Sequence, residues 1–205
     1  SFTTRRVVAI QHGEAIFSLE ASFQADEPGL EHQFDAPADV PDPEALASQR
    51  ELFLRAEHVP EAVRRYWANE RPLEIRPAAI DHYLSRVKLP PRQNVWMRTH
   101  GPVPADRALQ AAILAYLSDM TLLDTSTFAH GRAVFDPDLQ VASLDHAMWF
   151  HRPHALDGWM LYTADSPSTS GARGFTRGMI YSQDGELIAS VAQEGLIRLR
   201  TKTKT

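Results

Sequence analysis

The sequence has no cysteine in its 205 residues. The chain therefore forms no disulfide, and it has neither a thiolate nucleophile nor a sulfur ligand for a metal. It also lacks any apolar run close to the roughly 20 residues that a membrane-spanning helix needs, and no secretory signal pattern opens it. These absences predict a cytoplasmic protein that does not insert into membranes.

Acidic residues outnumber basic residues on this chain, 26 to 21. The formal net charge is −5, and no segment forms a basic stripe. Nucleic acid is therefore not expected as a partner, because its binding depends on clustered lysine and arginine. An anionic small molecule stays open as a ligand, since a local loop can still be basic. The length allows one generous domain or two small ones with a sizeable core.

One short segment of the chain occurs twice. Residues 11–22, QHGEAIFSLEAS, and residues 183–194, QDGELIASVAQE, share Gln, Gly, Glu, Ile and Ser in step, at an offset of 172 (183 minus 11). In each copy a glycine lies between two β-rich runs, and Asp184-Gly185 is a strong hairpin signal. The match marks either a duplicated unit or hairpin chemistry that arose twice.

A duplicated unit predicts what should precede each hairpin. Before the second copy we expect strands near 94–99, 143–151 and 158–163 and a helix over about 104–123. Nothing equivalent precedes Ser1, which suggests that the chain lacks the first helix and strands of its first unit. Between the copies, residues 26–90 are polar and punctuated by proline, and they predict a linker with short helices that wraps a surface.

The expected helix carries a stripe of small residues that ends in an acid. Ala108, Ala112 and Ala115 lead at helical spacing to Asp119. A carboxylate at the end of a mostly apolar helix is a candidate general base, because burial near apolar walls tunes its basicity. Alternatively, the alanines only allow close packing, and Asp119 marks the end of the helix. The broad apolar face expected to meet a sheet consists of Leu109, Ile113, Tyr116, Leu117 and Met120.

The stretch SLDHAMWFHRP, residues 143–153, predicts a strand dense in functional groups. Strand alternation puts Ser143 and Asp145 on one face and His146 on the other. Three histidines with Asp145 suggest zinc, but His146 and His151 point to opposite faces, so no metal site is expected. The side chains expected to serve in packing are His146, Met148 and Phe150.

Two further stretches carry polar groups that can meet a ligand. In residues 166–178, SPSTSGARGFTRG, backbone donors and an arginine can receive a phosphate or a pantetheine amide, although a solvated loop is the simpler interpretation. The candidate substrate-binding residues of this stretch are Ser170, Gly171 and Arg173. Gln193 lies inside the closing strand, where a buried amide must find partners, whereas its counterpart in the first copy is Ala21.

Six motifs follow one another from Ser1 to about Arg198: SFTTRRVVAIQHG, EHQ at 31–33, RPLEIRP, LDHAMWFHRP, SGARGFTRG and VAQEG. In this order and spacing they resemble the acyl-CoA thioesterase II family. The resemblance implies an α+β double hot-dog fold, in which antiparallel sheets each wrap around a central helix. It divides the chain into the last strands of a first unit (1–25) whose N-terminal part is missing, a linker with short helices (26–90) and a second unit (91–200).

The resemblance also implies hydrolysis of fatty acyl-CoA to free fatty acid and CoA, without a metal or other cofactor. It implies a water-activating trio at Asp119, Ser143 and Gln193, with serine where threonine is common, so that the hydroxyl is kept. Asp145, on the same strand face as Ser143, is the competing base. The family is expected to form a homodimer or a higher homo-oligomer.

Two other functions stay open at this point. One is a non-hydrolytic acyl-CoA-binding protein with the same fold. The other is a hot-dog enoyl-CoA hydratase, which acts on a double bond and leaves the thioester intact. Such hydratases usually present an Asp and a His from a helix and its loop, and the sequence places no histidine beside Asp119.

Overall fold

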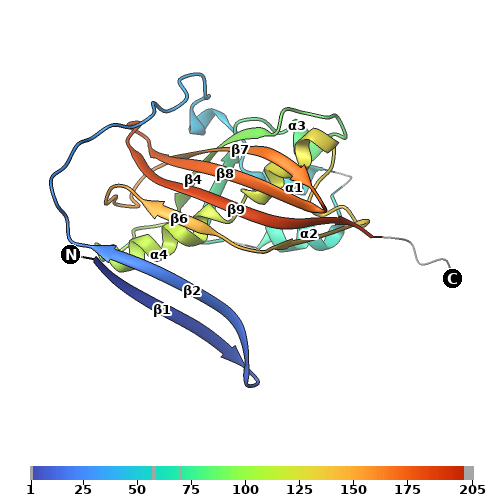
Figure 1. Cartoon of the computed structure of the whole chain (residues 1–205). Coiled ribbons are helices and arrows are strands. Elements are labelled where there is room, and N and C mark those ends of the chain that lie inside the picture. Colours follow the sequence, from blue (N-terminus) through green and yellow to red (C-terminus); the bar gives the residue numbers. More distant parts are fainter. Residues whose placement is uncertain (1, 57–58, 70, 201–205) are drawn as a thin grey trace. The chain divides into compact units, whose positions relative to one another are not determined.

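The computed structural model describes residues 2–56, 59–69 and 71–200 (Figure 1). The chain falls into two compact units, residues 1–32 and residues 33–205. Among the described residues, no helix combines the length and the apolar composition that crossing a membrane requires.

The first unit contains one antiparallel hairpin. Strands β1 (Phe2–Gln11) and β2 (Glu14–Gln24) pair from Phe2↔Gln24 to Gln11↔Glu14, with one register shift. The turn consists of His12 and Gly13, and both residues have positive φ, 51° and 85°. Two positive φ values are those of a type I′ turn, whose twist matches that of the flanking strands.

The second unit is built on one antiparallel sheet. Its strand order is β3-β4-β7-β8-β9-β5, and β6 pairs with β9 as well. In Figure 1, β7, β8, β9 and β6 run side by side. The strands are β3 (Leu73–Pro77), β4 (Arg92–Thr99), β5 (Leu139–Ser143), β6 (Ala147–Phe150), β7 (Met160–Ser170), β8 (Arg173–Ser182) and β9 (Leu187–Leu199).

Strand β3 comes from the stretch that was expected to be a linker. Leu73, Ile75 and Pro77 are buried and alternate with partly exposed residues, as a strand at a sheet edge requires. The sequence predicted part of a linker at residues 72–77, because two prolines flank this short alternation. The sheet of the second unit therefore begins before residue 91.

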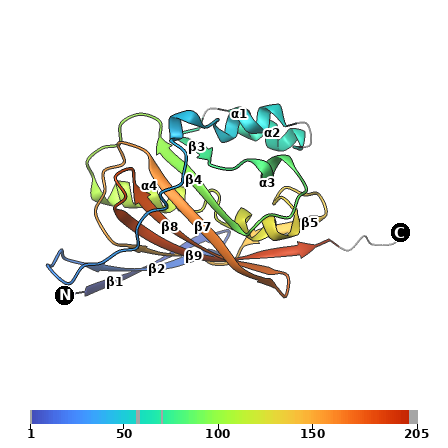
Figure 2. The ribbon, with the colours of Figure 1, turned by 90° about the horizontal axis from the view of Figure 1, so that it is seen from above.

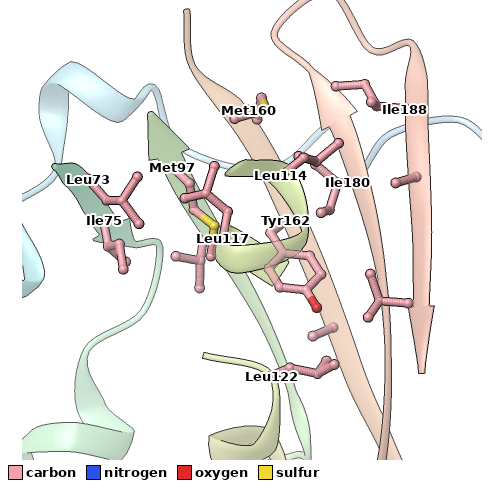
Figure 3. Packing of buried hydrophobic residues seen from close by; sticks show 14 of the residues in the cluster. Leu73, Ile75, Met97, Leu114, Leu117, Leu122, Met160, Tyr162, Ile180 and Ile188 are labelled. Atoms are coloured by element: carbon pink, nitrogen blue, oxygen red, sulfur yellow. The ribbon is translucent and has the colours of Figure 1, made fainter. Parts of the chain in front are cut away.

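Helix α4 (Arg107–Ser118) packs against one face of this sheet. Asp106 caps it, because its side chain accepts hydrogen bonds from the backbone N–H groups of Ala108 and Leu109. Figure 3 shows Leu114 and Leu117 among the side chains of the strands, in one core cluster. The expected packing face was wrong in part. Leu109 and Tyr116 are exposed, whereas Leu114 and Leu117 are buried.

The helix is also shorter than expected. It ends at Ser118, and a 3₁₀ segment, η2 (Leu123–His130), follows after a turn. Gly131, in the left-handed conformation at φ 60°, ends that segment. The apolar composition of residues 120–123 reflects burial in the turn and not continuation of the helix.

The opposite face of the sheet is covered by the segment that follows the first unit. Trp96, Trp159 and Tyr181 form a second cluster there, against Val40 and Leu46. Trp96 Nε1 donates to the carbonyl oxygen of Pro41 at 2.9 Å, which fixes the segment on the sheet. Helix α1 (Gln49–Arg55) contacts β3, and Figure 2 labels it with α2 (Glu61–Ala68) and α3 (Asp81–Leu84). A short 3₁₀ helix, η1 (Pro43–Ala45), precedes them in the chain.

Candidate active site

Three polar residues from distant parts of the second unit meet at the end of α4. Asp119 is the residue that closes the helix, Ser143 is the last residue of β5, and Gln193 lies within β9. The Gln193 side-chain amide donates to Asp119 Oδ1 at 2.6 Å and to Ser143 Oγ at 3.1 Å. The structure thus brings together the three residues that the family resemblance implied as a trio.

Gln193 is the buried centre of this trio. Its residue surface is 0% exposed, while the side chain of Asp119 is 49% exposed. Both hydrogens of its amide nitrogen are used, one on each partner, so the amide fixes the carboxylate relative to the hydroxyl. Gln193 Oε1 is buried and has no hydrogen-bond partner among the described residues, which leaves one acceptor of the trio unused.

A break in the strand positions Ser143. The backbone N–H groups of Leu144 and Asp145 both donate to the carbonyl oxygen of Glu194, at 2.9 and 3.3 Å. Leu144 and Asp145 thus both lie opposite Glu194, which is a β-bulge. The continuous strand expected over 143–151 is therefore replaced by β5 and β6. Asp145 uses its Oδ1 to accept the Glu194 N–H at 2.8 Å, so this carboxylate holds the break in place.

The same break brings His146 to the trio, although the sequence predicted it in packing on the other face. His146 Nδ1 lies 3.8 Å from Asp119 Oδ1, and His146 Nε2 lies 2.8 Å from Ser118 Oγ. Burial lowers the pKa of the His146 imidazole, and the charges of Asp119 and Asp145 oppose that shift. The expectation that no histidine lies beside Asp119 was therefore wrong. Strand alternation alone cannot reveal the break.

The candidate substrate-binding residues Ser170, Gly171 and Arg173 lie at a hairpin turn. Gly171 and Ala172 form that turn between β7 and β8, both with positive φ, so the expected loop is mostly strand. Arg173 Nε donates to Glu194 Oε1 at 2.9 Å. Within the described part of the chain, no hydrogen bond joins these three residues directly to the trio.

Comparison with known proteins identifies the family. A family model described as acyl-CoA thioesterase matches residues 63–196. Acyl-CoA thioesterase 2 of Haemophilus influenzae is 39% identical over 97% of this chain and 69% of its own length, and human acyl-coenzyme A thioesterase 8 is 38% identical over 98% and 65%. The chain belongs to the acyl-CoA thioesterase family.

Solved structures agree with this family assignment. An acyl-CoA thioesterase II, TesB2, from Mycobacterium marinum is 42% identical, with a TM-score of 0.78 over 98% of this chain and 70% of that one. A hot-dog protein from Alicyclobacillus acidocaldarius, 18% identical with a TM-score of 0.72, shares the fold. The predicted family, thioesterase class and hot-dog fold are confirmed. This chain spans about two thirds of the length of the curated relatives it matches.

A pocket of about 350 Å³ borders Met120, the residue that follows Asp119. Met120 is part of its wall, and most of the remaining wall is aromatic or aliphatic, which is typical of sites for apolar ligands. Burial raises the pKa of Asp124, at the same wall, to about 7; the hydrogen bond from Tyr83 opposes the rise, and the charge of Asp119 adds to it. The lining residues are Gln49, Phe53, Ala62, Val63, Tyr66, Trp67, Tyr83, Met120, Asp124, Val134 and Phe135.

The described side chains form no cluster of metal ligands. Among the described residues, no group of three or more His, Asp or Glu side chains is arranged to hold an ion. His151, which the sequence raised as a zinc ligand, instead lies with Nε2 at 2.8 Å from Ser190 Oγ.

Proposed function

We propose that this chain hydrolyses the thioester of an acyl-CoA to a free carboxylic acid and CoA, with Asp119 as general base. The convergence of Asp119 and Ser143 on the Gln193 amide is the observation that supports this proposal most strongly. Membership of the acyl-CoA thioesterase family supports the same reaction.

The proposed mechanism begins with attack by water. The water oxygen bonds to the thioester carbonyl carbon while Asp119 accepts one water proton. The tetrahedral intermediate then collapses, the carbon–sulfur bond breaks, and the proton goes to the departing thiolate. No covalent enzyme intermediate is needed, because the thioester carbonyl is already electrophilic.

Ser143 is proposed to supply the hydrogen bond that the reacting oxygen needs. Its Oγ accepts from Gln193, so its own hydrogen remains to be donated to the water or to the developing oxyanion. Gln193 acts on both partners, because it holds the base and the hydroxyl in a fixed relation. This division of roles explains why an amide suits this position better than a charged side chain.

The two ends of the substrate are proposed to bind on either side of the trio. The apolar pocket beside Met120 is suited to the acyl chain. On the CoA side, Ser170 and Gly171 offer turn donors and Arg173 offers a guanidinium for phosphate or pantetheine groups. Because Arg173 already pairs with Glu194, an arriving phosphate would compete with that carboxylate.

A second candidate function is hydration of an enoyl-CoA. The position of His146 Nδ1 at 3.8 Å from Asp119 Oδ1 favours it, since hot-dog hydratases are expected to use an Asp and His pair. The two functions differ in product: hydrolysis releases free CoA, whereas hydration consumes the double bond and releases none. Acyl-CoA binding without turnover is the third outcome.

The test is release of free CoA from saturated acyl-CoAs of several chain lengths and from an enoyl-CoA. We expect Asp119→Asn to lower kcat on the order of a hundredfold or more, because the amide keeps the shape and removes the base. Asp145→Asn is the matched control and should lose much less, since its Oδ1 can still accept the Glu194 N–H. Hydrolysis that survives Asp119→Asn but disappears in folded Asp145→Asn would assign the base to Asp145.

Location, assembly and unit boundaries are also part of this proposal. The absence of cysteine fits a cytoplasmic enzyme of fatty acid metabolism. Among the described strands β6 pairs only with β9, and a free strand edge of this kind suits edge-to-edge pairing in a homodimer. The repeat supports a first hot-dog unit that includes residues 1–25 and a second that spans 91–200 together with β3.

A further inference from the structure

His146 is held in one tautomer by Ser118. Ser118 Oγ has a single hydrogen and two neighbours, the carbonyl oxygen of Ala115 at 2.7 Å and His146 Nε2 at 2.8 Å. A carbonyl oxygen only accepts, so the Ser118 hydrogen goes to Ala115. Ser118 Oγ must then accept from the imidazole, which places the hydrogen of neutral His146 on Nε2.

The other ring nitrogen consequently faces Asp119 without a hydrogen. His146 Nδ1 and Asp119 Oδ1 lie 3.8 Å apart, so two hydrogen-bond acceptors face each other. This arrangement is unfavourable for two bare acceptors and becomes favourable once one proton is available between them. Hydrolysis supplies such a proton when a water is deprotonated at Asp119.

We propose that His146 is a positioning residue that acts through Asp119: its Nδ1 shares the proton that Asp119 takes from water, and it returns that proton for the departing thiolate. This inference rests on the proposed function. The proton passes from Asp119 Oδ1 to His146 Nδ1, which regenerates the carboxylate and forms an imidazolium. The reverse transfer protonates the CoA sulfur through Asp119 and restores neutral His146.

The surroundings of His146 suit a group that changes charge during the reaction. Its side chain is 24% exposed, and the charges that act on it are those of Asp119 and Asp145, both negative. Burial lowers the pKa of His146, so the ring is neutral at the start of the cycle, while the two carboxylates stabilise the imidazolium once it forms.

The first measurement determines the tautomer and the pKa of His146, and it does not depend on turnover. In ¹⁵N NMR of histidine-labelled protein, the neutral ring of His146 should carry its hydrogen on Nε2, and Ser118→Ala should relax that preference. Asp119→Asn should lower the pKa of His146 further, because the charge that raises it is lost. An unchanged pKa in Asp119→Asn overturns the inference.

The second measurement is the pH dependence of kcat for CoA release. His146→Gln retains an N–H donor for Ser118 and has no titrating nitrogen. We expect its kcat at neutral pH to fall about tenfold. In the wild type we expect activity to be lost as pH falls through the pKa of His146, and in the variant this limb should move to lower pH.

Asp124 is the necessary control, because burial raises its pKa to about 7 and the charge of Asp119 adds to the rise. Asp124 lines the pocket proposed for the acyl chain, so the readout of Asp124→Asn is the position of its acid limb and not the size of kcat; that limb should stay where it is in the wild type. A His146→Gln enzyme whose acid limb stays in place overturns the inference and assigns His146 to structure. A wild type that releases no CoA contradicts the proposed function instead, and the NMR titration then still decides whether His146 and Asp119 are coupled.

Discussion

The two hairpins of this chain share sequence but differ in how they turn. β1 and β2 are joined by His12 and Gly13, with Gln11 paired to Glu14. In the second hairpin Ser182 N donates to the carbonyl oxygen of Glu186 at 2.8 Å, so that three residues form the turn and Gly185 alone has positive φ. Gly13 and Gly185 therefore share φ 85°, although the first turn has two residues and the second has three.

The extra turn residue changes the pairing along the whole second hairpin. Arg5 pairs with Ala21 in the first copy, whereas the matching Arg177 pairs with Ala192 in the second. Gln193 pairs instead with Thr176, whose Oγ1 donates to the Gln193 carbonyl oxygen at 3.2 Å. Local sequence thus specifies a hairpin, while its register depends on the turn and on what packs against it.

The second hairpin is also approached closely by other side chains. A Cβ on Gly195 would lie 2.5 Å from both methyl groups of Leu123, and a Cβ on Gly178 would lie 2.3 Å from the Tyr162 ring. The first copy has Phe23 and Arg6 at the two matching positions. Glycine at these two positions lets Leu123 of η2 pack against β9, the strand that carries Gln193, and lets Tyr162 of β7 pack against β8.

The sharpest test of this difference moves the amide between the copies. Gln193→Ala gives the second hairpin the residue that the first has, and removes the donor to Asp119 and Ser143. We expect kcat for CoA release to fall on the order of tenfold to a hundredfold. Ala21→Gln is the matched control and should leave kcat unchanged. Full activity in folded Gln193→Ala would mean that the amide is not required.

The second test concerns the close approach at Gly195. Gly195→Ala should destabilise the protein by about 1–3 kcal/mol, because the added methyl overlaps Leu123. Thermal unfolding measures this as a drop in Tm of roughly 2–4 °C for each kcal/mol. Gly29→Ala is the control, since a Cβ there meets nothing within 4 Å. Equal Tm values for the two variants would show that Leu123 moves aside freely.

The three residues that the family resemblance implied do meet through hydrogen bonds, whereas a neighbour of these residues was misplaced. Helical spacing singled out Asp119 and the repeat singled out Gln193 as candidates, because each depends on a local pattern, while their grouping with Ser143 came from the resemblance to the family. The side of His146 was not predicted, because it depends on the break at Leu144 and Asp145, which is made by hydrogen bonds to Glu194 some 50 positions away. Alternation assumes an unbroken strand and therefore assigns His146 to the wrong face.

The same limit applies to lengths of elements. The helix was expected to reach residue 123 because residues 120–123 are largely apolar, but it ends at Ser118. Met120 and Leu122 are apolar because they meet the pocket and the core after the chain has turned. Composition records burial, whereas the end of a helix depends on backbone geometry that composition does not encode.

The smallest expected effect is at the turn of the second hairpin. Gly185 has φ 85°, a conformation that strains any residue with a Cβ, so Gly185→Ala should lower stability by about 1 kcal/mol even though the added atom makes only an ordinary contact, 3.9 Å from Ala36. Gly158→Ala is the matched control, because it has no positive φ and a similar 3.9 Å contact. A loss of Tm confined to Gly185→Ala would assign the cost to backbone conformation. Equal losses would show that the left-handed conformation of Gly185 adds no cost of its own to this turn.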